Sequence, residues 1–392
     1  MAVPPRADAD DAALNARGLS TVDVSQIPSV LLHDHLDGGV RPETMVTLAA
    51  AAGLTHLPHT NPQELAHHFA ATAVRGSLPS YLDSFALVYP LLRSAQVLTD
   101  IAHQAVVDTY ADGVAYAEFR FAPTLHIGPG LSVDDVVAAV CAGLQAGVAA
   151  CDGFMVAVPV LAVMRDDDEH VWWQVARAAD RFATGFDVAG PERGWPVRRC
   201  APVFEWLADA DVPVTVHAGE DGTCHDIAAA VLVAGARRVG HGTALARDTG
   251  FVTGLLATRR VLVEACVSSN VHTGACSTAQ DHPLMSLLAA GVPVCVNTDN
   301  RTFSATSMSQ EVVAAATVFG LSDRQLARCA VDAVAASFAP NPVRVALLEH
   351  MRPSLAAAGV QVRDADVTAG PPASTAVFCS PTAAAAVTDV HT

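Results

Sequence analysis

The sequence predicts a TIM (β/α)8 barrel, and three observations carry that prediction. Short apolar runs rich in β-branched residues alternate with longer segments of helical periodicity along most of the chain. Eight such strand–helix units can be counted, and the right-handed crossover of each unit makes the strands parallel. No Gly-x-Gly-x-x-Gly follows an early strand, as a dinucleotide-binding sheet would require. These features favour a closed barrel over a doubly wound sheet.

Each predicted strand is an apolar run bounded by turn residues. The first begins at Val30 and is stopped by Gly38 and Gly39. Several of the runs end in a polar residue. The predicted strands span residues 30–35, 114–120, 154–163, 185–190, 212–217, 238–241, 261–266 and 292–298.

The helices between the strands are predicted from apolar periodicity and capping residues. Ser132 is the expected N-cap of one of them, with Asp134 and Asp135 in the first turn, where acidic side chains stabilise the helix dipole. Helices are predicted at residues 132–150, 170–183, 200–210, 226–234, 252–257 and 283–290, and closing helices at 309–319, 323–338 and 343–358.

The stretch after the first strand contains more helix than a barrel crossover needs. Helices are predicted at residues 43–52, from Pro62 onward, at 79–92 and at 100–111. An insertion here lies over the carboxyl end of the first strand, where a barrel builds its active site. We therefore expect these extra helices to form a lid.

Three regions are predicted along the chain. Residues 1–27 are expected to be an N-terminal arm, and residues 28–364 the barrel domain. Residues 365–392 consist mostly of Ala, Thr, Pro and Ser without periodicity, which predicts a flexible tail.

Composition excludes several classes of function. The chain has 392 residues, of which 51% are hydrophobic, and a formal net charge of -17. A chain this acidic has no electrostatic reason to bind a nucleic-acid polymer, although a neutral nucleoside remains compatible. No apolar run reaches membrane-spanning length, so no membrane partner is expected.

Lysine and cysteine usage narrow the chemistry further. All 23 basic residues are Arg, which excludes a Schiff-base Lys, a P-loop Lys and a Lys general base. The 9 Cys are scattered, and no pair has the two-residue gap of a zinc clip or redox motif. With no apolar targeting segment at the start, the prediction is a cytoplasmic protein with reduced thiols.

Two histidines at the end of the first predicted strand are candidate metal ligands. Side chains two apart in a strand point to the same face, so His33 and His35 project together, and Asp37 continues the same parity. Two converging imidazoles suit a divalent metal ion. A His-rich turn with solvated rings is the alternative for this stretch alone.

More polar residues follow the later strands. Each one alone is more often a structural residue, because a buried polar group needs only a hydrogen-bonding partner. Several of them at one end of one barrel, together with His33 and His35, favour shared ligation of a metal ion. These residues are His217, Glu220, His241, Asp299 and Asn300.

The complete pattern resembles the adenosine deaminase family of the amidohydrolase superfamily, in the style of its actinobacterial members. The resemblance covers residues 28 to 345 and preserves the order of every segment. The matching segments are His-Asp-His-Leu-Asp-Gly (33 to 38), Ala-Gly (189 and 190), His-Ala-Gly-Glu (217 to 220), Gly-His-Gly (240 to 242), Ser-Ser-Asn-Val-His-Thr-Gly (268 to 274) and Asn-Thr-Asp-Asn (297 to 300).

This resemblance implies one catalytic zinc ion bound by His33, His35, His217 and Asp299. Three neutral imidazoles and one carboxylate leave a site whose bound water is acidic. Related binuclear enzymes bridge two metals with a carbamylated Lys, which this chain does not have. The His-x-Glu and Pro-Cys-x-x-Cys motifs of the other deaminase design are also absent.

The resemblance also implies a reaction, the hydrolytic deamination of adenosine or 2′-deoxyadenosine to the inosine product and ammonia. Glu220 would protonate ring N1, so burial should raise its pKa, while His241 and Asp299 would orient the attacking water and handle its proton. The implied substrate contacts are His35, Asp37 at the ribose 5′-hydroxyl, the Gly190 N–H at N3 and Asn300 at N7. The structural alternatives are a helix-start carboxylate for Glu220, a core histidine for His241 and a strand-end cap for Asp37.

Some residues depart from the family pattern. Many members carry Asp where Asn300 stands; the Asn amide donates at any pH and its carbonyl accepts, so Asn300 is expected to tolerate bases with a hydrogen on N7. The segment 221–225 and Val267 are atypical and leave the exact substrate open. The remaining histidines considered are interpreted as solvated, namely His225 and the pairs His56/His59 and His67/His68 of the predicted lid.

Three alternatives to an adenosine deaminase of purine salvage stay open at this point. The first keeps the chemistry but acts on another 6-aminopurine compound, such as aminofutalosine or an antibiotic nucleoside. The second is a zinc hydrolase of an ester, lactone or amide, which would not need a proton donor such as Glu220 for a ring nitrogen. The third is a nucleoside-binding protein without turnover. Oligomeric state is left open.

Overall fold

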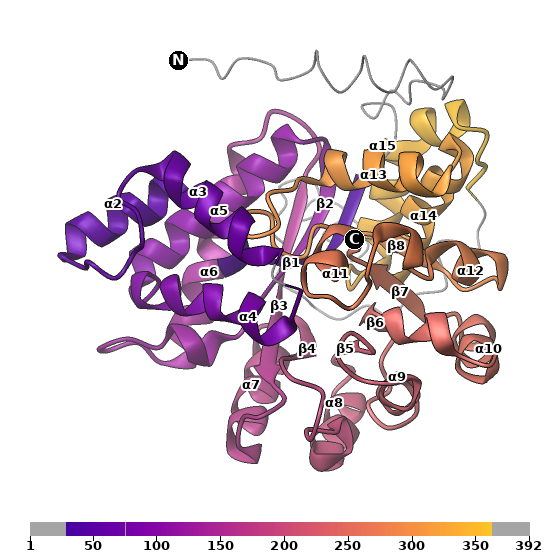
Figure 1. Cartoon of the computed structure of the whole chain (residues 1–392), viewed down its shortest axis with the longest axis horizontal. Helices are drawn as coiled ribbons and strands as arrows, with labels where there is room; N and C mark the ends of the chain where they lie inside the picture. Colours follow the sequence, from indigo (N-terminus) through magenta and orange to yellow (C-terminus); the bar gives the residue numbers. More distant parts are fainter. Residues whose placement is uncertain (1–28, 75, 363–392) are drawn as a thin grey trace, which may run out of the picture.

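Eight parallel strands form the centre of the computed structural model, and helices surround them (Figure 1). The structure describes residues 29–74 and 76–362. The strands pair in the orders β1-β2-β3-β4 and β5-β6-β7-β8. They are β1 (Ser29–His35), β2 (Val114–Phe121), β3 (Val156–Met164), β4 (Gly185–Ala189), β5 (Thr215–Ala218), β6 (Arg238–His241), β7 (Leu262–Ala265) and β8 (Val294–Val296).

Two single bridges join the two four-stranded sheets into a barrel. Phe186 of β4 pairs with Val214, just before β5, and Asp34 of β1 pairs with Asp299, just after β8. Around the second bridge the His35 N–H donates to the Asp299 carbonyl at 2.7 Å, and the Asp299 N–H donates to the His33 carbonyl at 2.9 Å. The predicted (β/α)8 barrel is confirmed, and its closure brings the first and last strands together.

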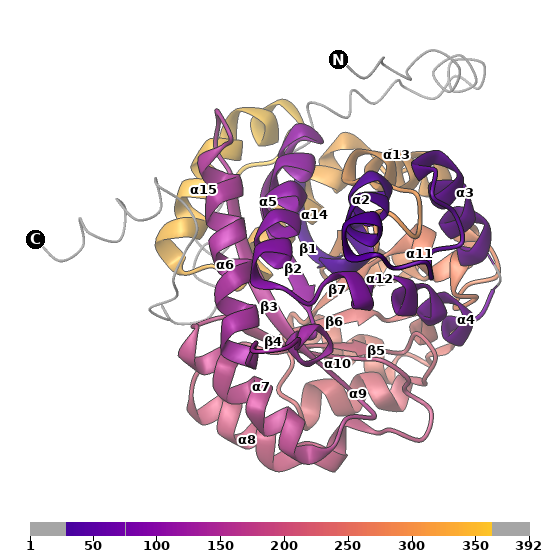
Figure 2. The ribbon, with the colours of Figure 1, turned by 90° about the vertical axis from the view of Figure 1, so that its left-hand side faces the viewer.

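The helices bury apolar faces against the strands. Ser132 caps α6 as expected, since its hydroxyl accepts the Asp135 N–H and the Asp135 carboxylate accepts the Ser132 N–H. Figure 2 shows α5 and α6 packed side by side. The α-helices are α2 (Pro42–Ala52), α3 (Pro62–Ala73), α4 (Leu78–Leu82), α5 (Ala95–Ala111), α6 (Val133–Ala149), α7 (Glu169–Arg181), α8 (Ala201–Asp209), α9 (Cys224–Leu232), α10 (Phe251–Arg259), α11 (Val267–His272), α12 (Leu284–Ala289), α13 (Met308–Phe319), α14 (Asp323–Ala336) and α15 (Asn341–Ala357).

The prediction of one helix over 79–92 is wrong. The segment forms the short helix α4 and two 3-10 turns, η3 (Asp83–Leu87) and η4 (Tyr89–Leu91). Pro90 excludes an α-helix through the second half of this segment, because its nitrogen has no N–H to donate to the Ala86 carbonyl and its ring clashes with the preceding turn. Helix α5 also begins earlier than predicted, where the Ser94 hydroxyl accepts the Val97 N–H at 3.3 Å.

Other expectations concern the ends of the chain and its thiols. The predicted arm at 1–27 and tail at 365–392 lie outside the described residues, so the domain boundaries stay predictions. The cysteines in the described ranges are free thiols. Within those ranges, no helix is both long enough and apolar enough to cross a membrane.

The aromatic core between α7, α8 and β4 offers a test of the packing. Phe204 is 2% exposed, and its ring lies 5.8 Å from that of Trp172 in an edge-to-face arrangement. Phe204→Ala is expected to lower the free energy of unfolding by about 3–5 kcal/mol, because it leaves a cavity in a close-packed core. Urea unfolding followed by circular dichroism measures the change.

A matched control is Phe251→Ala, because Phe251 is 74% exposed. This substitution should change the free energy of unfolding by less than about 0.5 kcal/mol. Equal losses for the two variants would contradict the packing described for Phe204.

Candidate active site

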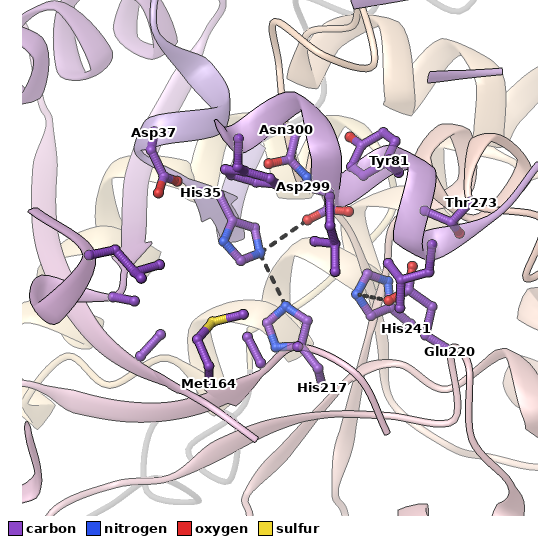
Figure 3. Close-up of a pocket in the computed structure, with 18 of the residues that line it drawn as sticks. His35, Asp37, Tyr81, Met164, His217, Glu220, His241, Thr273, Asp299 and Asn300 are labelled. Carbon is purple, nitrogen blue, oxygen red and sulfur yellow. Dashed lines mark hydrogen bonds and ion pairs between the residues drawn. The ribbon is translucent and has the colours of Figure 1, made fainter. Parts of the chain in front are cut away.

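A pocket lies at the carboxyl ends of the strands (Figure 3). It encloses about 600 Å³ of empty space, part of it open to solvent. The extra segments after β1 supply one wall, and whether they move as a lid stays a prediction. The residues that line it are His35, Asp37, Leu78, Tyr81, Leu82, Phe85, Tyr89, Ala122, Leu125, Ala162, Met164, Ala189, Gly190, His217, Glu220, His241, Thr273, Asp299 and Asn300.

Four side chains converge beside this pocket in a group that can hold a metal ion, namely His33, His35, His217 and Asp299. His35 Nε2 lies 3.1 Å from His217 Nε2 and 3.3 Å from Asp299 Oδ1. His33 Nε2 also lies 3.3 Å from that oxygen and, although buried, has no hydrogen-bonding partner. Ligands about 2.0–2.1 Å from a tetrahedral zinc are about 3.3 Å from one another. The spacing therefore fits a metal ion.

Two buried carboxylates orient the imidazoles of this group. His33 Nδ1 donates to Glu264 at 2.8 Å, and His217 Nδ1 donates to Asp187 at 3.2 Å. With the proton on Nδ1, each Nε2 presents its lone pair to the centre of the group, as in other metal sites. Burial lowers the pKa of His35 to about 3, so its ring is neutral and able to bind a metal.

Below the metal group, the two carboxylates join a chain of ion pairs that crosses the barrel. Arg120 donates to Asp187 and to Glu264, both at 2.9 Å, and Arg238 donates to Glu264 and to Glu118, both at 2.5 Å. All five side chains are fully buried. Burial of charges is costly unless each is paired, and here every charge has at least one partner. The chain of ion pairs thus holds both orienting carboxylates in place.

His241 lies next to the metal group in a strained backbone conformation. Its φ of 64° is left-handed, which is rare for a residue with a side chain. The Asn270 amide donates to Nδ1 at 3.0 Å, so the proton of the neutral ring lies on Nε2, 3.4 Å from a Glu220 oxygen. Burial lowers the pKa of His241 well below its usual value, which keeps the ring neutral.

Asp299 also has a left-handed backbone, with a φ of 59°. One carboxylate oxygen faces His33 and His35, and the other accepts the Ser269 hydroxyl in a short hydrogen bond. Ser269 lies on α11, a helix that the sequence did not predict. These contacts aim the Asp299 carboxylate at the metal group from the end of β8.

Glu220 lies next to His241 on one side of the pocket, and its side chain is buried (Figure 3). Burial raises the pKa of its carboxyl group well above the usual value, and the nearby carboxylates of Asp299 and Glu192 raise it further. Both effects favour the protonated carboxyl group of Glu220 over its carboxylate. A protonated carboxylic acid beside a metal group can donate a proton to a bound substrate.

The other expected substrate contacts also line the pocket. Asp37 lies in the 3-10 turn η2 (Asp37–Gly39), so the strand parity predicted for it is wrong, because β1 ends at His35. Its carboxylate accepts the Gly38 N–H at 3.1 Å, as a cap would, and still reaches the pocket. Gly190 has a φ of +89°, and a Cβ there would approach Met164 Cε to 2.9 Å.

The remaining histidines lie away from this centre. His225 is exposed, and neither it nor the four histidines of α3 and its preceding loop are among the described residues that line the pocket. Sequence reasoning missed a larger set of supporting side chains. These are Glu118, Arg120, Asp187, Glu264, Ser269 and Asn270.

Comparisons with known proteins identify the family of the chain. The family model described as Adenosine deaminase matches residues 28–353. The chain belongs to the adenosine deaminase family. Its curated relatives include the adenosine deaminase of Mycobacteroides abscessus, which is 39% identical over 348 residues (85% of this chain and 96% of the relative), and that of Mycobacterium tuberculosis, 39% identical over 346 residues (84% and 95%).

Solved structures of an adenine deaminase and of an amidohydrolase share the fold. An adenine deaminase from Arthrobacter aurescens superposes with a TM-score of 0.74 at 26% identity, over 83% of this chain and 98% of the other. An amidohydrolase from Burkholderia ambifaria with bound zinc has a TM-score of 0.76 at 20% identity, over 86% and 92%. The family match and these two structures thus agree with the barrel fold.

The orienting role of Glu264 gives a prediction about metal binding. The Glu264 carboxylate accepts hydrogen bonds from His33 and from two arginines. Glu264→Gln replaces one of its oxygens with an amide nitrogen that cannot accept, so the His33 imidazole is less firmly held. Loss of such an outer contact is expected to weaken metal affinity by about 10–100-fold. Competition with a chelator, followed by metal analysis of the protein, measures the affinity.

Glu205→Gln is the matched control, since Glu205 is exposed on α8. It should bind metal with the affinity of the unmodified protein. If Glu264→Gln bound metal as tightly as this control, Glu264 would not support the metal group.

Proposed function

We propose that this protein catalyses the zinc-dependent hydrolytic deamination of adenosine and 2′-deoxyadenosine, releasing ammonia and the inosine product. The observation that carries the proposal is the buried Glu220 carboxyl group, 3.4 Å from His241 and beside a group of three histidines and one aspartate. Curated relatives named adenosine deaminase, at 39% identity over most of the chain, support it. A place in purine salvage and a cytoplasmic location stay predictions.

One zinc ion per chain is the proposed cofactor, held by His33, His35, His217 and Asp299. Three nitrogen ligands and one carboxylate oxygen are a donor set that zinc accepts. Bound there, zinc supplies Lewis acidity, which makes a water molecule nucleophilic near neutral pH.

The residues around the metal group would divide the proton transfers. The Asp299 carboxylate accepts a proton from the attacking water, while the neutral His241 ring fixes the position of that water. Glu220 donates its proton to purine N1, which makes C6 electrophilic and allows it to become tetrahedral. The Asp299 carboxyl group then returns the water proton to the C6 amino group, which leaves as ammonia. The Glu220 carboxylate accepts the N1 proton again, so that the inosine product forms as its 6-hydroxy tautomer and both carboxyl groups are ready for the next cycle.

The pocket walls would set the orientation of the purine nucleoside. The Gly190 N–H donates to N3, Asn300 contacts N7, and Asp37 accepts the ribose 5′-hydroxyl, with His35 beside the sugar. Apolar side chains from α4 and η3 exclude water from the base. None of the described residues that line the pocket is Arg, which favours a nucleoside over a nucleotide with a charged phosphate.

The other candidate functions are less well supported. An ester or lactone hydrolase gains nothing from a buried carboxylic acid placed to protonate a ring nitrogen. A binding protein without turnover does not need two strained residues, His241 and Asp299, directed at a metal group. Other 6-aminopurine compounds remain the nearest alternative substrates.

The first prediction concerns the reaction itself. The purified protein is expected to contain about one zinc per chain and to release ammonia from adenosine, with loss of both after chelation and return of both after zinc is added. Metal analysis and an ammonia assay test this. Zinc without ammonia from any 6-aminopurine nucleoside would contradict the deaminase proposal.

The second prediction concerns Glu220. Glu220→Gln is expected to lower kcat by about 10²–10⁴-fold, because an amide cannot transfer a proton to N1. The acid form is the active form, and its pKa is raised, so kcat should be retained below the raised pKa and fall as the pH rises through it. A pH profile of kcat should show this alkaline limb in the unmodified protein and not in Glu220→Gln, whereas the Glu205→Gln control should keep both rate and limb.

The third prediction concerns Asn300, which is 2% exposed and whose side-chain oxygen is buried without a hydrogen-bonding partner. An amide can donate to the N7 lone pair of adenosine or accept from the N7–H of a C-nucleoside analogue. Both compounds should therefore be substrates, and Asn300→Ala should change the ratio of their kcat/KM values. An equal loss for the two substrates would argue against a discriminating role for Asn300.

A further inference from the structure

Glu192 is a buried carboxylate with no substrate contact in the proposed reaction, although its charge raises the pKa of Glu220. It lies in the loop between β4 and α8, two residues after Gly190, and is 4% exposed. Its carboxylate contacts the turn that carries Glu220, which follows the next strand, β5. A buried charge in this position requires partners, and their arrangement is unusual.

Four consecutive backbone N–H groups donate to the Glu192 carboxylate. One oxygen accepts the N–H of Glu220 at 2.7 Å, of Asp221 at 3.0 Å and of Gly222 at 3.2 Å, and the other accepts the Gly219 N–H at 2.8 Å. Bonds to an ionised carboxylate are roughly twice as strong as neutral ones. The backbone on either side of Glu220 is therefore bound to one side chain of a different loop.

A buried arginine, Arg165, lies next to the Glu192 carboxylate. Arg165 Nη2 lies 3.8 Å from the Glu192 carboxylate and donates to the His217 carbonyl at 2.7 Å, and Nη1 donates to the Trp195 carbonyl at 3.0 Å. Arg165 is itself 1% exposed. The carboxylate is thus fixed between the loop that carries Gly190 and the end of the strand that carries His217.

We propose that Glu192 is a positioning residue that binds the Glu220 turn to the Gly190 turn and so sets the distance between two contacts to the purine ring. The inference rests on the proposed function, in which Gly190 meets N3 and Glu220 meets N1. The two atoms lie on the same six-membered ring, so the purine fits only when both turns keep their relative position. Glu192 is the side chain that connects those turns.

The space around the turn supports this role. A Cβ at Gly222 would come within 2.4 Å of the Glu192 carboxylate, so only glycine leaves it in place. Gly219 has a φ of +75°, a conformation that lets its N–H turn toward Glu192. Both ends of the turn are therefore shaped around this carboxylate.

Glu192→Gln tests the proposal, because the amide nitrogen replaces one acceptor with a donor that opposes a backbone N–H. A displacement of Glu220 by about 1 Å is expected to lower kcat by about 10–100-fold, while KM for adenosine stays within about threefold. The control is Asp226→Asn. Asp226 accepts the Thr223 N–H and hydroxyl, both at 2.8 Å, on the other side of the same loop without touching Glu220. That variant should keep kcat within about threefold, and thermal unfolding is compared for both.

A double-mutant cycle separates positioning of Glu220 from a general structural role. In a Glu220→Gln background, Glu192→Gln should cause less than about threefold further loss of the residual ammonia release, since residues that act together are not additive. An equal loss in both backgrounds, or a kcat equal to that of Asp226→Asn, would overturn the inference.

Two other results need separate treatment, a Glu192→Gln variant that does not fold and an unmodified protein that is inactive. If Glu192→Gln does not fold, Gly222→Ala takes its place in the same cycle, because its Cβ would come within 2.4 Å of the Glu192 carboxylate. That Cβ would also come within 2.8 Å of Asp226 Oδ2, and Asp226→Asn measures the effect of losing that second group. An additive loss, or a kcat equal to that of Asp226→Asn, again overturns the inference. If the unmodified zinc-loaded protein releases no ammonia, the proposed function fails. Failure of the inference alone leaves the unmodified protein active and the two losses additive.

Discussion

The backbone hydrogen bonds that close the barrel are the interaction on which the site depends. They pair the end of β1 with Asp299, just after β8. Because of this pairing, His33 and His35 from the start of the domain face an aspartate from its end, and the intervening strands add His217 and His241 at the same edge. Without closure, the two histidines of β1, His217 of β5 and Asp299 after β8 would not be held together. Folding of the barrel and formation of the site are therefore one event.

Below the four metal ligands, the interior of the barrel contains charged side chains. An apolar core there would cost less free energy of folding. Glu118, Arg238, Glu264, Arg120 and Asp187 alternate in sign and are fully buried. Such a network contributes little net stability, but it fixes the rotamers and tautomers of His33 and His217. The left-handed backbones of His241 and Asp299 are a further cost in stability, and the surrounding structure keeps both residues in this conformation. The buried ion pairs and the strained backbones thus lower stability, but they hold the side chains of the site in fixed positions.

Much of the architecture could be predicted because strand period and strand ends are local signals. The parity of His33 and His35, and the polar residues after β5, β6 and β8, follow from two-residue alternation and from the position of the apolar runs. The single helix over 79–92 was wrong in its second half because Pro90 outweighs the apolar periodicity around it. Helix α11 was missed because Ser268, Ser269 and Asn270 are typical of loops, and tertiary contacts make them helical. The orienting carboxylates Asp187 and Glu264 were missed although each is an acid inside an apolar strand, a costly position that signals a buried partner.

The central claim is that Glu220 and Gly190 hold the two sides of one purine ring beside the metal group. The most direct test is a crystal structure of the zinc-loaded protein with inosine bound. We expect zinc bound by His33, His35, His217 and Asp299. Purine N1 should lie within hydrogen-bonding distance of the Glu220 carboxylate, and N3 at the Gly190 N–H. A purine bound with its sugar toward Glu220, or a metal ion held by other residues, would contradict it.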